Sequence, residues 1–451
     1  MKPIRTKSGM EGFSGTTTVS QYQADLAHCY LNLGVLYIRT GRGKEAEVSW
    51  QKALALLETL VLKNPTVTEY QANLAASHLS VGILYRDTGR KKEAEVSYEK
   101  ALALRETLVQ KNPTVTQYQA DLAASHYNLG FLYRDTGRGK EAEVSWQKAI
   151  ALLETLVLKN PTITQYQANL VHCYLNLGLL CIGTGRKKEA EASYQKALAL
   201  QETLVLKNPT VTQYQADLAN SHNILGLLYS DVGRSKEAEV SWQKALALRE
   251  TLVQKNPTVT QYQADLAASN YNFGILYSDT GRSKVAEVSW QKAIAIQETL
   301  VQKNPTVPEY RFDLATTRNR LAWSICFSAK RLPEEYQKAL SLAGAASLSQ
   351  PTNGGFLNTL GVAQFRVKDY VAAITTLEKS NAINRTEAKG REEPGDLAFL
   401  AMAQFQLGKV KEAEGYFKKL QEAMKNPSLG GDKDNKAILE EAEQLFKSAK
   451  K

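Results

Sequence analysis

The stretch from Tyr70 to Pro113 decides the fold of this chain, and it reads YQANLAASHLSVGILYRDTGRKKEAEVSYEKALALRETLVQKNP. A first helix is predicted up to the turn at Gly89, because glycine readily takes the left-handed conformation that ends a helix. A second helix is predicted from Lys-Glu-Ala-Glu to Pro113, because proline pushes the residue before it out of the helical region. The stretch therefore predicts two helices joined by a tight turn.

The same block recurs along most of the chain. Its Asn-Pro pair returns every 48 residues, at Asn64-Pro65, Asn112-Pro113, Asn160-Pro161, Asn208-Pro209, Asn256-Pro257 and Asn304-Pro305. A glycine inside the first helix keeps the same interval, at Gly34, Gly82, Gly130, Gly178, Gly226 and Gly274. A fixed period of this length is typical of repeat architectures, in which neighbouring repeats bury one another's apolar faces. We therefore predict an all-α superhelical solenoid of antiparallel helix pairs.

One set of positions in the block carries a family resemblance: His78-x2-Val81-Gly82-x2-Tyr85, then Ala94, Tyr98 and Ala101. This spacing resembles that of the tetratricopeptide repeat, whose ordinary unit has 34 residues. The additional length of about fourteen residues predicts about two extra turns in each helix. The long repeats resemble the arrays C-terminal to some bacterial serine/threonine kinases and, more distantly, the repeats of kinesin light chains. The sequence contains neither His-Arg-Asp nor Asp-Phe-Gly, so the resemblance implies no phosphotransfer.

Repeats and composition divide the sequence into five parts. Residues 1–18 are rich in Gly, Ser and Thr and are predicted to form a disordered leader. Six 48-residue repeats are predicted over residues 19–305, a degenerate seventh repeat over 306–353, and two shorter repeats over 354–433. A final helix over residues 434–451 is predicted to cap the core that the last repeat would leave exposed.

Composition favours a soluble protein without a membrane segment. The net charge of +10 is modest for an elongated molecule, and no block of five or more like charges occurs. Four cysteines without paired spacing indicate a reducing compartment. The first residues contain no apolar run of the length that a signal peptide or membrane span needs. We predict a cytoplasmic protein, and the resemblance implies a bacterial one.

No group of residues has the pattern of a catalytic or metal site. His78, His126 and His222 recur once per repeat, at the position that Tyr30 and Tyr174 occupy in sister repeats. This equivalence favours packing over metal ligation, because zinc needs three or four convergent ligands. No Ser, Cys or Thr is accompanied by the base and orienting group that a nucleophile requires. We predict a protein that is not an enzyme and holds no cofactor or metal.

Basic residues in the turns raise an alternative function, the binding of nucleic acid or another polyanion. An arginine follows the turn glycine of every long repeat, at Arg42, Arg90, Arg138, Arg186, Arg234 and Arg282. Acidic residues such as Glu45 and Glu47 lie close to them in sequence and neutralise much of their field. A solvated edge is therefore favoured over a phosphate track.

The favoured function is the binding of a peptide or helix on the concave face. The resemblance implies that the first helix of each repeat lines this face. Residues on this face vary between repeats whose other positions are nearly identical. This variation is consistent with recognition of a partner and equally with neutral variation on a solvated face. The implied positions are Leu31, Val35, Leu79, Ile83, Arg86, Tyr127, Phe131, Arg134, Leu175, Leu179, Asn223, Leu227, Tyr271, Ile275, Asn319 and Trp323.

These positions form an apolar and aromatic surface with Arg/Asp pairs at its edge, which predicts an extended or helical peptide as ligand. Self-association is a third possibility, because long faces built from similar repeats can stack end to end. The sequence indicates neither the identity of the partner nor the oligomeric state.

Overall fold

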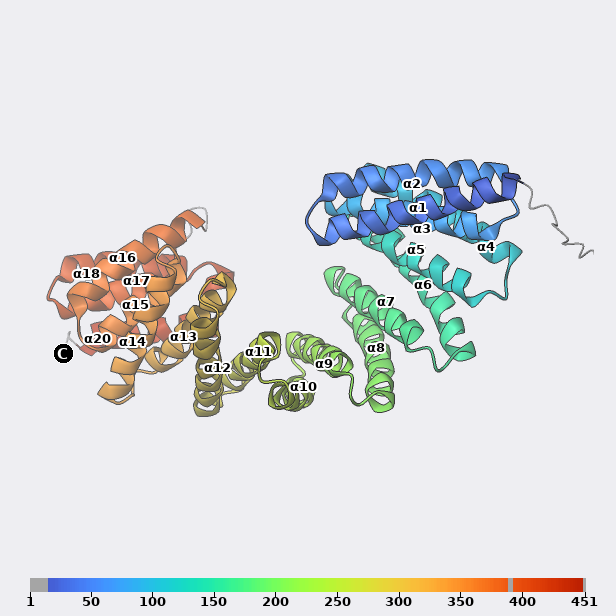
Figure 1. Ribbon diagram of the computed structural model, residues 1–451. Helices are drawn as coiled ribbons and strands as arrows, with labels where there is room; N and C mark the ends of the chain where they lie inside the picture. The colour runs from blue at the N-terminus through green and yellow to red at the C-terminus, as the bar shows by residue number, and fades with distance from the viewer. Residues whose placement is uncertain (1–14, 388–391, 449–451) are drawn as a thin grey trace, which may run out of the picture. The chain divides into compact units, whose positions relative to one another are not determined.

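The computed structural model describes residues 15–387 and 392–448 of the chain. Every regular element in those residues is a helix, and consecutive helices pair through short turns (Figure 1). The predicted all-α solenoid of helix pairs is therefore confirmed. The chain divides into two compact bodies, called here the N-terminal body (up to Tyr214) and the C-terminal body (from Gln215).

The N-terminal body contains repeats 1 to 4. Their first helices are α1 (Gly15–Arg39), α3 (Thr68–Asp87), α5 (Thr116–Asp135) and α7 (Thr164–Gly183), and their second helices are α2 (Gly43–Lys63), α4 (Lys91–Lys111), α6 (Gly139–Lys159) and α8 (Lys187–Lys207). After α1, the first helices have 20 residues and the second helices 21. At 1.5 Å per residue each is about 30 Å long, as the two extra turns predict. Helices α2, α4 and α6 each pack against the first helix of their own repeat and of the next repeat.

The C-terminal body continues the same pattern and then shortens. Repeats 5 and 6 are α9 (Thr212–Asp231) with α10 (Ser235–Lys255), and α11 (Thr260–Asp279) with α12 (Ser283–Lys303). The later helices are α13 (Pro308–Phe327), α14 (Pro333–Ser349), α15 (Gly354–Arg366), α16 (Tyr370–Glu387), α17 (Pro394–Gln406), α18 (Val410–Ala423), α19 (Pro427–Gly430) and α20 (Lys433–Ser448). Helix α20 packs mainly against α17, and its Glu441 pairs with Arg366 at the end of α15.

Two predicted boundaries differ from the structure. Helix α1 begins at Gly15, so residues 15–18 are helical although they were assigned to a disordered leader. Three consecutive threonines lower helix propensity there, but propensity is a weak determinant beside a helix that continues for six turns. Residues 1–14 lie outside the described residues. The last helix begins at Lys433, one residue before the predicted start, and residues 449–451 also lie outside the described part.

The turn between the two helices of a repeat requires glycine. In repeat 2, Gly89 has a φ of +80°, which other residues rarely adopt. The amide of Arg90 donates to the carbonyl of Tyr85 at 2.7 Å, and the amide of Gly89 donates to the carbonyl of Arg86 at 3.0 Å. These two bonds make a Schellman motif, which satisfies carbonyls that the helix end would otherwise leave unpaired. The turn thus fixes where each second helix starts.

A second glycine lets the two helices of a repeat approach closely. A Cβ added at Gly130 of α5 would lie 2.3 Å from Nε1 of Trp146 on α6. The indole is fully buried and its Nε1 donates to the carbonyl of Tyr127 at 3.2 Å. In repeat 2, Gly82 and Tyr98 make the same contact. Tryptophan and tyrosine therefore fill the same space in different repeats, and both depend on the glycine opposite.

Candidate peptide-binding face

The clearest part of the first-helix face lies on α5 of the N-terminal body. Tyr127 and Phe131 stand one turn apart there, with ring centroids 4.8 Å apart in an edge-to-face arrangement. The ring of Phe131 also meets Trp146, at 5.7 Å between centroids. Both Tyr127 and Phe131 remain half-buried, so part of each ring faces solvent. The core beneath holds these two rings in one orientation.

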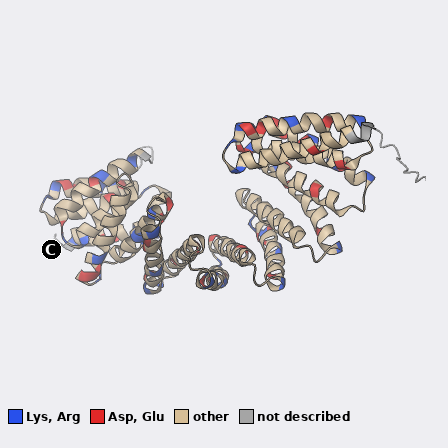
Figure 2. Ribbon diagram, viewed as in Figure 1, with Lys and Arg blue, Asp and Glu red and all other residues tan. Residues whose placement is uncertain are grey.

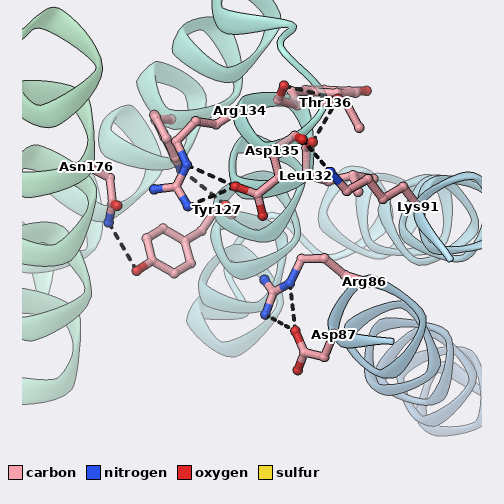
Figure 3. Close-up of polar contacts among 11 residues, drawn as sticks. Arg86, Asp87, Lys91, Tyr127, Leu132, Arg134, Asp135, Thr136 and Asn176 are labelled. Atoms are coloured by element: carbon pink, nitrogen blue, oxygen red, sulfur yellow. Dashed lines mark hydrogen bonds and ion pairs between the residues drawn. The ribbon is translucent and has the colours of Figure 1, made fainter. Parts of the chain in front are cut away.

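Two arginines from successive repeats flank the same aromatic ring. The guanidinium of Arg134 lies 4.8 Å from the ring centroid of Phe131, and that of Arg86 lies 5.8 Å from it. Both distances are in the range of cation–π attraction. Through Nε and Nη2, Arg86 donates hydrogen bonds to Asp87 and Arg134 donates to Asp135, at 2.8 to 3.1 Å (Figure 3). Among the described residues Nη1 of both arginines has no hydrogen-bond partner, which leaves donors for a ligand.

The hydroxyl of Tyr127 reaches the neighbouring repeat. It accepts a hydrogen bond from Nδ2 of Asn176 on α7 at 3.4 Å (Figure 3). Asn176 also donates to the carbonyl of His172 at 2.7 Å. Burial raises the pKa of Tyr127 to about 12, so the hydroxyl stays protonated at neutral pH. It can therefore donate a hydrogen bond to a ligand on this face.

A small cavity of about 80 Å³ opens beside Tyr127, between α5, α6 and α7. Its lining is mostly apolar and consists of Ala123, Ala124, Tyr127, Leu153, Asn169, His172 and Cys173. A cavity of about 110 Å³ occupies the same place around Tyr271, three repeats later in the C-terminal body. Both cavities thus lie next to a predicted groove tyrosine, and each has a second-helix residue in its lining.

The other residues predicted to line the concave face, called here the groove residues, lie on the same face of their own helices. Their exposure to solvent varies. Val35, Leu179 and Leu227 are about half exposed, at 42%, 53% and 48%. The aliphatic and aromatic residues that pack partly on the core are Leu31, Leu79, Ile83, Leu175, Tyr271, Ile275 and Trp323. Asn223 and Asn319 are half-buried, and Oδ1 of Asn223 accepts from Asn272 at 3.1 Å. Each of these side chains keeps some surface that a ligand could contact. Their role in binding a partner stays a prediction.

The second helices contribute to this face through one position that the sequence analysis missed. The position is occupied in turn by Leu57, Arg105, Leu153, Gln201, Arg249 and Gln297, one in each long repeat. All six are buried, and Leu153 and Gln297 line the two cavities. This position varies among leucine, glutamine and arginine in second helices that are otherwise similar. That variation could have identified the position from the sequence.

Arg105 shows that this position can carry a buried charge. It is 5% exposed, and its Nη1 donates to the carbonyl of Asp121 at 2.7 Å and to Oγ of Ser125 at 2.8 Å. Burial lowers its pKa because the guanidinium is removed from water. Sister repeats have Leu57 and Leu153 here, so the surrounding packing accommodates an aliphatic side chain.

An Arg105→Leu variant is expected to be as stable as the original chain or more stable, by about 1 kcal/mol. Removing a buried charge relieves its desolvation cost, and Ser125 can still bond to a carbonyl one turn earlier in its own helix. Urea unfolding of the two proteins would measure the difference. A loss of more than about 1 kcal/mol would show that the guanidinium is a net stabilising element.

Four of the turn arginines make ion pairs between repeats. Arg90 pairs with Glu47 of the preceding second helix at 2.7 Å and with Glu93 at 3.0 Å, and it lies 4.0 Å from the ring centroid of Tyr85. The same inter-repeat pair to a glutamate occurs at Arg138, Arg186 and Arg282. Basic and acidic residues are interspersed along the helices of each body (Figure 2). These guanidiniums are therefore already matched by carboxylates.

The histidines lie apart, in separate repeats. His78, His126 and His222 are buried, as their equivalence to Tyr30 and Tyr174 predicts. Across residues 15–387 and 392–448, no three His, Cys, Asp or Glu side chains come together as a metal site would require. In the same residues, no helix combines the length and the apolar character that crossing a membrane demands.

Comparison with known proteins identifies the repeat. One profile described as tetratricopeptide repeat matches residues 26–64, 74–113, 122–160 and 218–257, and a second with that description matches residues 171–204. Each match falls on one helix pair and omits the first residues of its first helix. No curated protein matches the chain.

Three of the solved structures that match parts of the chain are as follows. BtubC (BKLC) from P. vanneervenii has 20% identity and a TM-score of 0.44, over 56% of this chain and 90% of that one. A tetratricopeptide repeat protein from Parabacteroides merdae has 15% identity and a TM-score of 0.38, over 71% of this chain and 98% of that one. PilF of Pseudomonas aeruginosa has 18% identity and a TM-score of 0.35, over 64% and 96%.

Proposed function

Because five of its helix pairs match profiles of the tetratricopeptide repeat, we propose that this chain is a non-enzymatic scaffold that binds a segment of a partner protein along its first-helix face. The observation that carries the proposal is the group formed by Tyr127 and Phe131 with Arg86 and Arg134. Two half-buried rings held by the core, with guanidinium donors beside them, have the composition of an interface hot spot. Such a group can anchor one apolar side chain and orient the acceptors next to it.

The segment that fits this face is an extended or helical peptide. An apolar side chain of the peptide would pack on the exposed parts of Tyr127 and Phe131. It would also enter the small cavity that Leu153 lines. Carbonyl or carboxylate oxygens of the peptide would accept from Nη1 of Arg86 and Arg134. The cavity is too small for most of a ligand, so the peptide would lie along the face and insert single side chains.

The test is a double variant that removes the anchor without disturbing the fold. Tyr127→Leu with Phe131→Leu places at both positions a residue that sister repeats already hold, as at Leu175 and Leu179. Partner affinity is expected to fall by about tenfold or more, since anchor residues of this kind contribute about 2 kcal/mol each. The measurement is affinity capture from the native cell with mass spectrometry, followed by titration of the captured partner.

A matched control keeps the outcome interpretable. Val144 lies on α6 and is 51% exposed, and Val144→Ala should leave every captured partner bound. The harsher pair Tyr127→Ala with Phe131→Ala extends the series if the leucine pair gives a partial effect. If all captured partners stay bound to both double variants at unchanged affinity, the first-helix face is not the binding surface.

The two alternatives make different predictions. Binding of a polyanion would have to draw on the turn arginines, whose pairing with glutamates makes this function less favourable. It predicts a steep fall of affinity with salt, whereas peptide binding predicts a shallow one. Self-assembly predicts a sedimentation coefficient that rises with concentration, and this measurement also determines the oligomeric state.

A further inference from the structure

The cavity around Tyr271 in the C-terminal body has the position of the Tyr127 cavity but a different chemistry. It is about 110 Å³ in volume and lies between α11, α12 and α13. Corresponding lining residues are each 144 positions apart: Leu153 with Gln297, Asn169 with Asp313, His172 with Thr316, and Cys173 with Thr317. Around the same tyrosine, Leu153, His172 and Cys173 have thus been replaced by oxygen-bearing residues, and the neutral amide of Asn169 by a carboxylate.

Two of these oxygens lack a hydrogen bond. Gln297 is 5% exposed, and its Oε1 has no partner among the described residues. The Oγ1 of Thr316, also buried, has none either. A buried acceptor without a donor raises the free energy of the folded protein, so a ligand that supplies donors gains from pairing with it.

A carboxylate completes the set of acceptors. Asp313 lines the same cavity from α13. Asp313 is partly exposed to solvent, and the burial of the rest of its side chain raises its pKa, with a smaller contribution from Glu309. A cation placed beside it would stabilise the ionised carboxylate. The aromatic rings of Tyr271 and Tyr310 form part of the wall and offer faces that also attract a cation.

A more open cavity of about 310 Å³ adjoins this one and shares Tyr271 and Thr316 with it. Two predicted groove residues, Asn319 and Trp323, lie in its lining. The charged residues around it are Arg320, Glu393 and Asp434. The open cavity therefore gives a peptide access to the narrow one, through surroundings in which carboxylates outnumber cations.

We propose that the narrow cavity binds the side-chain ammonium of a lysine in the partner segment. The three N–H donors of an ammonium would pair with Oε1 of Gln297, Oγ1 of Thr316 and the carboxylate of Asp313. The aliphatic stem would pass along Tyr271 toward the open cavity, where the peptide backbone lies. This inference rests on the proposed function, and it names the chemistry that the C-terminal body recognises.

Other side chains match the cavity less well. An apolar side chain would leave the acceptors of Gln297 and Thr316 unpaired, and sites built for hydrogen bonds discriminate strongly against ligands that lack them. A guanidinium is planar and presents its donors in a fixed fork, whereas an ammonium is compact and can direct its donors at three separate oxygens. A carboxylate would face Asp313 and be repelled.

The experiment uses the full chain and a lysine with both backbone ends blocked, N-acetyl-lysine N-methylamide. Saturation-transfer NMR should give signals from the lysine side chain, and none above background from N-acetyl-norleucine N-methylamide, which lacks only the ammonium. Alanine N-methylamide, whose α-amine is free, tests whether an N-terminal amine is the true ligand. Equal signals from lysine and norleucine, no signal from lysine, or a stronger signal from the free α-amine would each overturn the proposal.

Two variants locate the site. Gln297→Leu restores the residue found at Leu153 in the sister cavity, and Asp313→Asn removes the charge with little change of shape. Each is expected to weaken binding of the lysine compound by tenfold or more, while Val144→Ala on the exposed side of α6 leaves it unchanged. Binding that survives both variants together would overturn the assignment. If the lysine compound does not bind while the Tyr127 and Phe131 variants still release the partner, the lysine site is wrong and the proposed function stands, so the two proposals fail separately.

Discussion

A Gly130→Ala variant is expected to lose about 2 kcal/mol of unfolding free energy. The added methyl group would lie 2.3 Å from Nε1 and 2.6 Å from Cδ1 of Trp146. The indole is fully buried and anchored by its hydrogen bond to Tyr127, so it cannot move aside without losing that bond. The better helix propensity of alanine, about 1 kcal/mol, offsets only part of this overpacking. Urea unfolding followed by circular dichroism measures the loss.

The control for this variant is a glycine nearby in the same repeat. Gly139 opens α6, and a Cβ there would meet Leu180 at 3.6 Å, an ordinary contact. Sister repeats hold Lys91 and Lys187 at this position, so Gly139→Ala should leave stability unchanged or slightly higher. If both variants lost the same amount, the close approach of α5 to Trp146 would not explain the conserved spacing of glycine.

Acidification is expected to destabilise the chain through three buried histidines. Burial lowers the pKa of His78, His126 and His222 to about 4, with smaller contributions from nearby lysines. In the unfolded chain their pKa is about 6.5, so between about pH 6.5 and pH 4 the unfolded state binds more protons. The stability that neutral histidine gives is thus complete above about pH 6.5 and is lost as the pH falls toward 4. We expect a loss of about 2 kcal/mol for each histidine.

The sister repeats supply the matched replacement. Tyr174 occupies the same position and donates its hydroxyl to Glu154 on the preceding helix, and a glutamate stands at the corresponding place before each histidine, at Glu58, Glu106 and Glu202. A triple His→Tyr variant should therefore fold, and its urea midpoint should fall less between neutral pH and about pH 4 than that of the original chain. Identical pH profiles for the two proteins would contradict the assignment of acid lability to the histidines.

The framework could be predicted from the sequence because it is determined by local and repeated signals. Gly89 and its equivalents end first helices, prolines such as Pro113 end second helices, and the fixed interval places them throughout. The extra length of the helices follows from the interval alone. The start of α1 was predicted four residues late, since the threonines before Val19 resemble a linker and are carried into the helix by its continuation.

The candidate face could be predicted only in part. Family spacing points to first-helix positions such as Tyr127 and Phe131, but it does not show that Arg86 from another repeat reaches the same ring. The contribution of Leu153 and Gln297 was missed because second helices were assigned wholly to the core. Which positions open into a cavity depends on how tightly three helices pack, and that is a property of the assembled repeats.

Photo-cross-linking at the first-helix face tests the central claim most directly. Phe131 is replaced by the photoreactive analogue p-benzoylphenylalanine, and Val144 on the exposed side of α6 is replaced by the same analogue as the control. Irradiation in the native cell should yield a covalent adduct with a partner protein from position 131, mapped to one peptide segment, and no such adduct from position 144. Adducts from position 144 alone, or the same partner peptide from both positions, would contradict the proposal that this protein binds its partner along the first helices.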